Sequence, residues 1–516
     1  MVQISKSKRI GEIIKIAALP ILGGILLATS FPNFDIAIFA WFCLIPLLWN
    51  LTGSKSKHLF IQGFLFGVIY FYVSLFWVRR TMIDYGNLSV SISLLILFLL
   101  AGYCAIYVGV FAVMASQAIR RKQVPIIVAF PMIWVSLEFL RGHLITGFPW
   151  NAIGLSQYSN LWLLQNADWG SYYAISFILV LANTCIYLIL KRNFSRLTKI
   201  TSTVFAVSLI FLCWVYGIYR LNKCPNSMPF SVGIVQANVP QNIKWNQNTR
   251  ELILKRHLEL SQTAIDEDID LILWPESAIT FYYRYGWRYF DGNGRPLSGR
   301  IKNLVNTEKI PILLGTLDRV NDRTYNGAVL VTPEGLEQYY HKRHLVPFGE
   351  YVPLKSLLFF VNRLVEDTIG TFDHGKTSAN LQMKSTGLAV TICYENIFPA
   401  LVRESVLEGA DIICNLTNDA WFGRTSASKQ HFSASCFRAV ETRRPVIRAA
   451  NTGISGAVDT RGRITYQSPL FDSLAAKVEV FKGVETSFYL KYGDVFAWFC
   501  IVISLISIIP GIKFKK

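Results

Sequence analysis

The sequence is poor in charge and lacks the motifs of several common enzyme classes. Only 16% of its 516 residues are Asp, Glu, Lys or Arg, whereas soluble domains carry about a quarter. It has no glycine-rich phosphate loop and no Gly-x-Ser-x-Gly elbow, so nucleotide-dependent and serine-hydrolase mechanisms lack their residues. No Cys-x-x-Cys and no Cys/His spacing indicates a metal. We therefore expect neither a metal nor another cofactor.

Long apolar runs accompany the low charge. Hydrophobic residues make up 52% of the chain, and the mean hydropathy is +0.36. A helix needs roughly 20 apolar residues to cross a bilayer. Eight runs reach or approach that length: residues 13–30, 36–49, 59–77, 89–114, 124–139, 172–190, 200–219 and 495–512. The pattern predicts a polytopic α-helical membrane bundle with about eight crossings.

The basic residues indicate the orientation of this bundle. The net charge of +18 would favour nucleic acid in a soluble protein, but here Lys and Arg lie between apolar runs, so no nucleic-acid partner is expected. The alternate loops carry only Arg79, Arg80 and Arg141. One side holds the remaining loop cations: Lys6, Lys8, Arg9, Lys55, Lys57, Arg120, Arg121, Lys122, Lys191, Arg192, Arg196, Lys199, Lys513, Lys515 and Lys516. The bias predicts cytoplasmic termini and an external segment from about residue 220 to 494.

The external segment has a different pattern. Short apolar runs replace the long ones, at residues 232–236, 271–274, 312–315, 328–331, 388–393, 412–415 and 446–449. Helical patterns occupy residues 248–264 and 430–442. Such alternation predicts an α/β domain with a layered sheet. We therefore divide the chain into a seven-helix membrane region (1–222), an external catalytic domain (223–490) and a C-terminal membrane helix (491–516).

A thiol and three charged side chains follow strands or turns of the external segment. Cys393 ends one predicted strand, and Glu276 follows another that Pro275 stops. Lys342 and Glu350 lie around a turn. Strand ends are rigid and open into loops, so these groups are candidates for a common site.

Together these residue types are sufficient for acyl transfer. A carboxylate takes the thiol proton, and an ammonium stabilises the thiolate and the oxyanion formed on attack. His341 and His344 offer a Cys/His arrangement as the competing interpretation. Spacing alone leaves both interpretations open, and it also leaves open that Cys393 is simply a buried small hydrophobe.

The motifs around these residues resemble the nitrilase (carbon–nitrogen hydrolase) superfamily, with its Glu-Lys-Cys signature. Over its whole length the chain resembles a membrane-bound branch, the apolipoprotein N-acyltransferases. The matching segments are residues 147–150, 236–241, 244–245, 274–276, 342, 344–350, 393–395, 418–423 and 444–449. The resemblance implies a nitrilase-like αββα sandwich on the external side, and no catalytic position departs from the pattern.

The resemblance also implies a function. A bacterial inner-membrane enzyme would transfer the sn-1 acyl chain of a phospholipid, typically phosphatidylethanolamine, through a thioester on Cys393. The acceptor would be the N-terminal amine of diacylglyceryl-cysteine on an apolipoprotein, and the external domain would be periplasmic. Glu276 would be general base and then acid, and Lys342 would stabilise the oxyanion with the Tyr394 N–H. Glu350 would orient Lys342. Two alternatives remain: a membrane-anchored amidase or nitrilase that uses water as acceptor, and a transporter or scaffold whose external domain is inert.

Further predictions concern Glu395, two tryptophans and an apolar segment. Glu395 would hold local structure or the approach of the amine, and Trp245 and Trp421 would line a substrate pocket or pack in the core. Residues 352–361 are apolar for a loop, which fits either a membrane-dipping lid or a core helix. A monomer is expected.

Overall fold

The computed structural model describes residues 6–52, 55–223, 227–265, 268–351, 372–378 and 380–510, with side chains from residue 17 onward. Cys224 and the 352–361 segment therefore lie outside the described residues. Contacts divide the chain into two units. The helical unit comprises Met1–Asn222, Thr425–Gln430 and Tyr492–Lys516, and the sheet unit comprises Lys223–Arg424 and His431–Lys491. The division by sequence did not single out the segment Thr425–Gln430.

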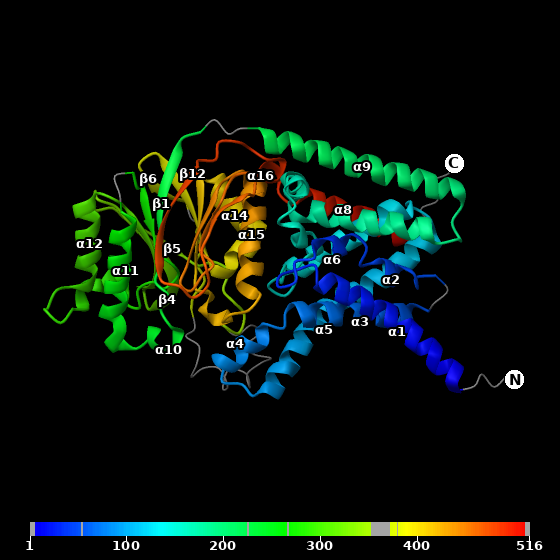
Figure 1. Cartoon of the computed structure of the whole chain (residues 1–516), viewed down its shortest axis with the longest axis horizontal. Helices are drawn as coiled ribbons and strands as arrows, with labels where there is room; N and C mark the ends of the chain where they lie inside the picture. The colour runs from blue at the N-terminus through cyan, green and yellow to red at the C-terminus, as the bar shows by residue number, and fades with distance from the viewer. Residues whose placement is uncertain are drawn as a thin grey trace. The chain divides into compact units, whose positions relative to one another are not determined.

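The helical unit is built from the apolar runs of the sequence (Figure 1). Its principal helices are α1 (Lys6–Ala28), α3 (Ser56–Ser74), α4 (Val78–Asp84), α5 (Val90–Arg121), α6 (Ile126–His143), α8 (Ala167–Leu190), α9 (Arg196–Asn222) and α17 (Val495–Ile508). Short helical pieces are η1 (Ala37–Trp41), α2 (Ile45–Leu48), η2 (Ile153–Gln157) and α7 (Leu161–Leu164). The helix α16 (Phe488–Tyr492) precedes α17.

Several of these helices have the length and composition of membrane spans. Among the described residues, four single helices are long and apolar enough to cross a membrane: α5, α6, α8 and α9. The pair α3 and α4, bent by 53°, makes a fifth if it is counted as one span. Shorter apolar helices occupy Ala17–Ala28, Ala37–Leu48 and Val495–Ile508. The predicted apolar runs are thus helical, while the count of eight crossings is not confirmed.

Buried charges at the end of α6 organise the segment that follows it. The Glu138 carboxylate accepts a hydrogen bond from the backbone N–H of Ile153 at 2.8 Å. The Arg141 guanidinium donates to the carbonyl oxygens of Phe148 and Trp150, at 2.6 and 2.9 Å. The two charges therefore supply partners to backbone groups that would otherwise lie unpaired in an apolar surrounding.

The sheet unit contains two six-stranded sheets (Figure 1). The first has the order β12-β1-β2-β3-β4-β5, and the second has the order β11-β10-β9-β8-β7-β6. The first sheet consists of β1 (Pro229–Gln236), β2 (Leu271–Leu273), β3 (Ile312–Val320), β4 (Arg323–Val331), β5 (Glu337–His341) and β12 (Leu474–Phe481). The second consists of β6 (Asn380–Met383), β7 (Thr386–Ile392), β8 (Ile412–Thr417), β9 (Val446–Ala450), β10 (Gly456–Val458) and β11 (Ile464–Gln467). This confirms the predicted layered α/β domain.

Helices cover the outer faces of both sheets. Figure 1 shows α11 (Arg250–Ala264) and α12 (Leu297–Glu308) beside the first sheet, and α14 (Pro399–Leu407) and α15 (Ala427–Thr442) beside the second. Short helices stand in the loops: α10 (Gln241–Lys244), η3 (Gln247–Thr249), η4 (Tyr283–Arg288), η5 (Cys393–Ile397) and η6 (Asp419–Phe422). The sequence pattern missed α12, α14 and five strands.

Four of the five missed strands, β5, β6, β11 and β12, are edge strands, and the fifth, β10, is buried but only three residues long. The strand β11 is mostly exposed, and β12 begins with partly exposed residues, so neither contains the buried apolar run that marked the others. β5 is only half-buried, with the sequence Glu-Gln-Tyr-Tyr-His. Edge strands of this kind are specified by pairing with a neighbour, which single-strand patterns do not report.

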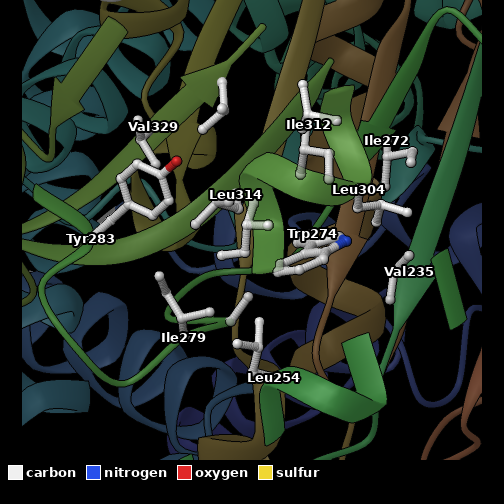
Figure 2. Close-up of a cluster of buried hydrophobic side chains, with 14 of the residues drawn as sticks. Val235, Leu254, Ile272, Trp274, Ile279, Tyr283, Leu304, Ile312, Leu314 and Val329 are labelled. Atoms are coloured by element: carbon white, nitrogen blue, oxygen red, sulfur yellow. The ribbon is translucent and has the colours of Figure 1, made fainter. Parts of the chain in front are cut away.

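The core of the first sheet holds the strand that precedes Glu276. Figure 2 shows Trp274 surrounded by Leu254 of α11, Leu304 of α12 and strand residues such as Ile272 and Leu314. The Trp274 indole donates to the Ser261 hydroxyl at 2.8 Å, which satisfies its buried N–H. This packing fixes the end of β2, so the residues that follow it begin from a rigid point.

Candidate active site

Cys393 stands at the sharp turn that follows β7. Its φ is +51°, in the left-handed region that residues other than glycine seldom adopt. The strand ends at Ile392, and the helix η5 begins at Cys393 itself. Such strained conformations cluster at functional sites, where the surrounding structure holds them. At this turn the Cys393 side chain leaves the alternating pattern of the strand, and the residue is 9% exposed.

Glu276 follows β2 and is held from several directions. One carboxylate oxygen accepts from Asn326 Nδ2 at 2.7 Å, and the other accepts from the backbone N–H of Asn418 at 2.9 Å. The Lys244 ammonium donates to the backbone carbonyl of Glu276 at 3.2 Å. Burial lowers the pKa of Lys244 to about 8, although the Glu276 carboxylate opposes the shift. Glu276 is therefore held at both carboxylate oxygens and at its backbone carbonyl, where the partner is the buried Lys244 amine.

Lys342 lies between two carboxylates. Its Nζ is 2.9 Å from Glu350 Oε2 and 3.6 Å from Glu276 Oε1, and the side chain is 1% exposed. Burial opposes the charge on the Lys342 ammonium, but the two carboxylates outweigh it and raise the pKa above its usual value. The lysine is therefore a permanent cation inside the site.

Asn326 of β4 joins the two carboxylates and was not predicted from the sequence. Its Nδ2 donates to Glu276 Oε1 at 2.7 Å and to Glu350 Oε1 at 2.8 Å. Its backbone carbonyl accepts from the Lys342 N–H at 2.8 Å. The two N–H groups of the Asn326 amide can each bind one carboxylate, so this residue holds Glu276 and Glu350 beside the Lys342 ammonium.

The thiol is coupled electrostatically to these groups. Burial, assisted by the Glu276 and Asp419 carboxylates, raises the pKa of Cys393 to about 12, and the Lys342 ammonium opposes this shift. The Thr417 hydroxyl also lowers the pKa of the thiol. Because this pKa lies far above neutral, the resting group is a thiol and not a thiolate. Attack on an ester therefore requires a base that removes the proton.

Two further glutamates complete the surroundings. Glu350 bonds Lys342, and its Oε2 accepts from the Val346 N–H at 2.8 Å, which closes the turn after β5. The Glu395 carboxylate accepts from the backbone N–H groups of Ile392 at 2.8 Å and Arg343 at 2.7 Å. Burial raises the pKa of Glu395, and the backbone donors oppose this shift.

Further donors to Glu395 come from two neighbouring residues. The Tyr340 hydroxyl lies 2.8 Å from Oε1, and the His344 N–H donates to Oε1 at 3.1 Å. Glu395 thus ties the end of β7 to the loop that carries Lys342. These contacts favour the structural alternative predicted for this residue over contact with the amine.

The two predicted histidines have other partners. His341 Nε2 lies 2.8 Å from Asp318 Oδ2, and its ring stacks on Tyr325. The His344 ring packs against Phe398, and burial lowers its pKa to about 4. The described contacts connect neither imidazole with the thiol, and the charges that shift the thiol pKa include Glu276 and Lys342 but neither histidine.

A different histidine, His431 of α15, reaches the backbone of Cys393. Its Nε2 lies 3.0 Å from the backbone carbonyl oxygen of Cys393. Its Nδ1 faces Asp419 Oδ1 at 3.3 Å and Arg448 Nη2 at 3.1 Å. Arg448 and Asp419 form an ion pair at 2.6 Å, and both side chains are fully buried. The matching segments 418–423 and 444–449 contain Asp419 and Arg448, but His431 was not predicted from the sequence.

Tyr394, Trp245 and Trp421 have more open or aromatic surroundings. The Tyr394 ring packs against Phe398 with ring centroids 5.0 Å apart. Trp245 is 44% exposed and Trp421 is 37% exposed, so neither is a core residue. Their segments are joined by a 2.9 Å hydrogen bond from Asn418 Nδ2 to Gln241 Oε1. Within the described residues, no three His, Cys, Asp or Glu side chains are grouped to hold a metal ion.

Comparisons with known proteins match both parts of the chain. Residues 23–185 match the apolipoprotein N-acyltransferase N-terminal domain, and residues 231–478 match the carbon-nitrogen hydrolase family. An apolipoprotein N-acyltransferase of Geobacter metallireducens is 37% identical over 505 residues, covering 96% of this chain and 95% of that protein. The chain belongs to the apolipoprotein N-acyltransferase family.

A second relative agrees with this assignment. The apolipoprotein N-acyltransferase of Methylococcus capsulatus is 32% identical, with 93% of each chain covered. Among solved structures, Saccharomyces cerevisiae Nit3, a member of branch 10 of the nitrilase superfamily, aligns with a TM-score of 0.38 at 20% identity, covering 49% of this chain and 90% of that chain. The predicted resemblance to the family is confirmed, and this chain is an acyltransferase with a nitrilase-like domain.

Proposed function

We propose that this enzyme transfers the sn-1 acyl chain of a phospholipid, typically phosphatidylethanolamine, to the α-amine of diacylglyceryl-cysteine at the N-terminus of an apolipoprotein. One observation carries the proposed mechanism. A buried thiol is coupled to a carboxylate and to a lysine that stays protonated. These are the groups that a thioester mechanism requires.

In the first half-reaction Glu276 takes the Cys393 proton, and the sulfur attacks the carbonyl carbon of the ester. The negative oxygen of the tetrahedral intermediate is stabilised by the Lys342 ammonium and the Tyr394 N–H. The C–O bond then breaks, Glu276 returns its proton to the leaving oxygen, and lysophospholipid departs. Cys393 carries the acyl chain as a thioester. Glu350 and Asn326 keep Lys342 directed at the intermediate.

In the second half-reaction the lipoprotein amine attacks the thioester carbon. Glu276 accepts a proton from the attacking nitrogen, the same two donors stabilise the oxyanion, and the C–S bond breaks. An amide forms, and the sulfur leaves as a thiolate that regains its proton from Glu276. Glu276 thus acts as base and then acid in each half-reaction, and no cofactor takes part. Trp245 and Trp421, being exposed, contact the lipid or peptide parts of the substrates.

Both substrates are anchored in a bilayer, which sets the proposed topology. The helical unit crosses the bacterial inner membrane about eight times, with both termini in the cytoplasm and the catalytic domain in the periplasm, as the distribution of Lys and Arg predicts. The enzyme works as a monomer. Labelling with a membrane-impermeant maleimide tests this topology. Cysteines introduced at exposed positions of the sheet unit should react from outside the inner membrane.

An acceptor assay separates this function from a membrane-anchored amidase with the same residues. Purified enzyme in liposomes receives phosphatidylethanolamine and a diacylated lipopeptide that carries a free N-terminus. The proposed function predicts an N-acylated lipopeptide and lysophospholipid in equal amounts. Release of free fatty acid without the amide product would establish the hydrolase instead.

A further inference from the structure

The peptide group between Cys393 and Tyr394 is held on its carbonyl side. His431 Nε2 lies 3.0 Å from the Cys393 carbonyl oxygen. This peptide bond is trans, because the cis bonds among the described residues are Pro32-Asn33 and Gly453-Ile454. In a trans peptide the C=O and N–H point in opposite directions. A side chain that fixes the carbonyl of Cys393 therefore also fixes the direction of the Tyr394 N–H.

The partners of His431 define its protonation. A carbonyl oxygen only accepts hydrogen bonds, so Nε2 must carry a proton. Nδ1 lies 3.1 Å from Arg448 Nη2, which only donates, and 3.3 Å from Asp419 Oδ1, which only accepts; the shorter contact makes Nδ1 an acceptor. Burial and the Arg448 charge lower the pKa of His431, in agreement with a neutral ring. These contacts assign the neutral Nε2–H form.

The cluster behind His431 is rigid. Arg448 donates to Asp419 Oδ2 at 2.6 Å and to Asn415 Oδ1 at 2.8 Å, and its Nε donates to the Ile454 carbonyl at 3.0 Å. Each of these side chains is fully buried, so the guanidinium has little freedom to move. The imidazole is therefore held in place by groups of the second sheet.

We propose that His431 is a positioning residue for acyl transfer, which holds the Cys393–Tyr394 peptide so that the Tyr394 N–H faces the developing oxyanion. This inference rests on the proposed function and deepens it. A hydrogen bond to the carbonyl also polarises the amide and strengthens its N–H as a donor. His431 is not the base of the reaction, because its Nε2 proton is directed to the carbonyl and its Nδ1 faces Arg448 and Asp419.

Two isosteric variants test the contact. Gln places its amide nitrogen near the position of Nε2, whereas Asn places it near Nδ1 and does not reach the carbonyl. Full-length enzyme in liposomes is mixed with phosphatidylethanolamine in a single turnover, and acyl-enzyme is followed by intact mass. His431→Asn should slow acylation about 100-fold, the usual effect of losing one oxyanion donor. His431→Gln should recover most of this loss. Equal rates for the two variants would overturn the proposal.

Alkylation of Cys393 distinguishes a role of His431 in stabilising the oxyanion from a merely structural role. Iodoacetamide reacts with the thiolate by displacement at a saturated carbon, which forms no oxyanion. In His431→Asn the alkylation rate should equal that of the wild type at each pH while acylation falls. Parallel losses in both reactions would mean that His431 acts on the thiol or on folding, and would contradict the inference.

His257→Asn is the matched control. This imidazole is also buried and also lies against a backbone carbonyl, that of Ile253 at 2.8 Å, but within its own helix α11. Its replacement should leave acylation unchanged, and a loss equal to that of His431→Asn would contradict a specific role for His431. Cys393→Ala keeps the two proposals apart. If that variant still transfers acyl groups, the proposed function fails whatever the His431 variants do.

Discussion

Two clusters of buried charge flank Cys393, and each sheet supplies one. The cluster of the first sheet contains Glu276, Lys342, Glu350 and Asn326, and its charges are coupled to the thiol. This cluster contains the carboxylates of Glu276 and Glu350 and the ammonium group of Lys342. In the proposed mechanism these groups act on the atoms that react, so the cluster serves the reaction rather than the fold.

The cluster of the second sheet contains Asp419, Arg448 and His431. Its hydrogen bond to Cys393 is made to the backbone carbonyl, while the Asp419 charge also raises the pKa of the thiol. Each polar group in it has a close partner, and burial is complete. The difference between the clusters separates two uses of buried charge. Changes in the first should reduce activity with little loss of stability, and changes in the second should reduce stability as well.

The largest effect is expected in the first cluster. Glu276→Gln removes the base while keeping the size and the hydrogen bond to Asn326. Acyl-enzyme formation should fall about 1,000-fold, within the usual range for general acid–base catalysis, because the thiol has a pKa of about 12 and cannot ionise unaided. Rapid-quench single turnover measures the rate.

The control for this prediction is Glu259→Gln, which removes an exposed carboxylate of the same sheet unit that pairs with Lys255. Glu259→Gln should unfold at the temperature of the wild type, and Glu276→Gln slightly below it, because the amide nitrogen of Gln cannot accept from the Asn418 N–H. A stability loss in Glu276→Gln that explains the lost activity would remove the distinction between the clusters.

Stability should respond most strongly in the second cluster. Arg448→Met leaves the Asp419 carboxylate buried without its ion pair, which costs roughly 3–5 kcal/mol of unfolding free energy in comparable buried pairs. Thermal unfolding in detergent measures the change. Arg463→Met breaks an exposed pair with Asp459 and should cost about 0.5 kcal/mol or less. Similar shifts for the two variants would show that the buried pair contributes no more than a surface one.

The pH dependence of Cys393 reactivity sharpens the comparison at the thiol itself. A pKa raised to about 12 means that the reactive thiolate fraction grows about tenfold per pH unit throughout the range below it. The iodoacetamide reaction of the free enzyme should therefore rise tenfold from pH 8 to pH 9 and again to pH 10. Cys393→Ala provides the background from other thiols. A plateau below pH 9 would mean that Lys342 outweighs burial.

The smallest effects are expected outside both clusters. Trp245 and Trp421 are partly exposed, so their replacement by Ala leaves no buried cavity. Each should raise the apparent KM for phospholipid or lipopeptide about threefold to tenfold, as the loss of part of an apolar contact does, with kcat nearly constant. A fall in kcat at constant KM would place these residues in the chemistry rather than in binding.

The sequence predicted the groups that stand at the ends of apolar strands, because a buried run marks the strand and the next residue marks its end. Asn326 escaped because its partners lie 50 and 24 residues away, brought together only by the pairing of β4 with β3 and β5. His431 escaped for the same reason, since 38 residues separate it from Cys393. Long-range contacts of this kind depend on sheet register, which local patterns do not contain.

The most direct test of the account is the mass of the protein after exposure to phospholipid without acceptor. Full-length enzyme in liposomes of phosphatidylethanolamine should gain one acyl group, mapped to the peptide that contains Cys393 and released by hydroxylamine. Addition of a diacylated lipopeptide should remove the group and produce the amide. An unmodified Cys393 under these conditions, or an acyl group that persists in Cys393→Ala, would contradict the thioester mechanism.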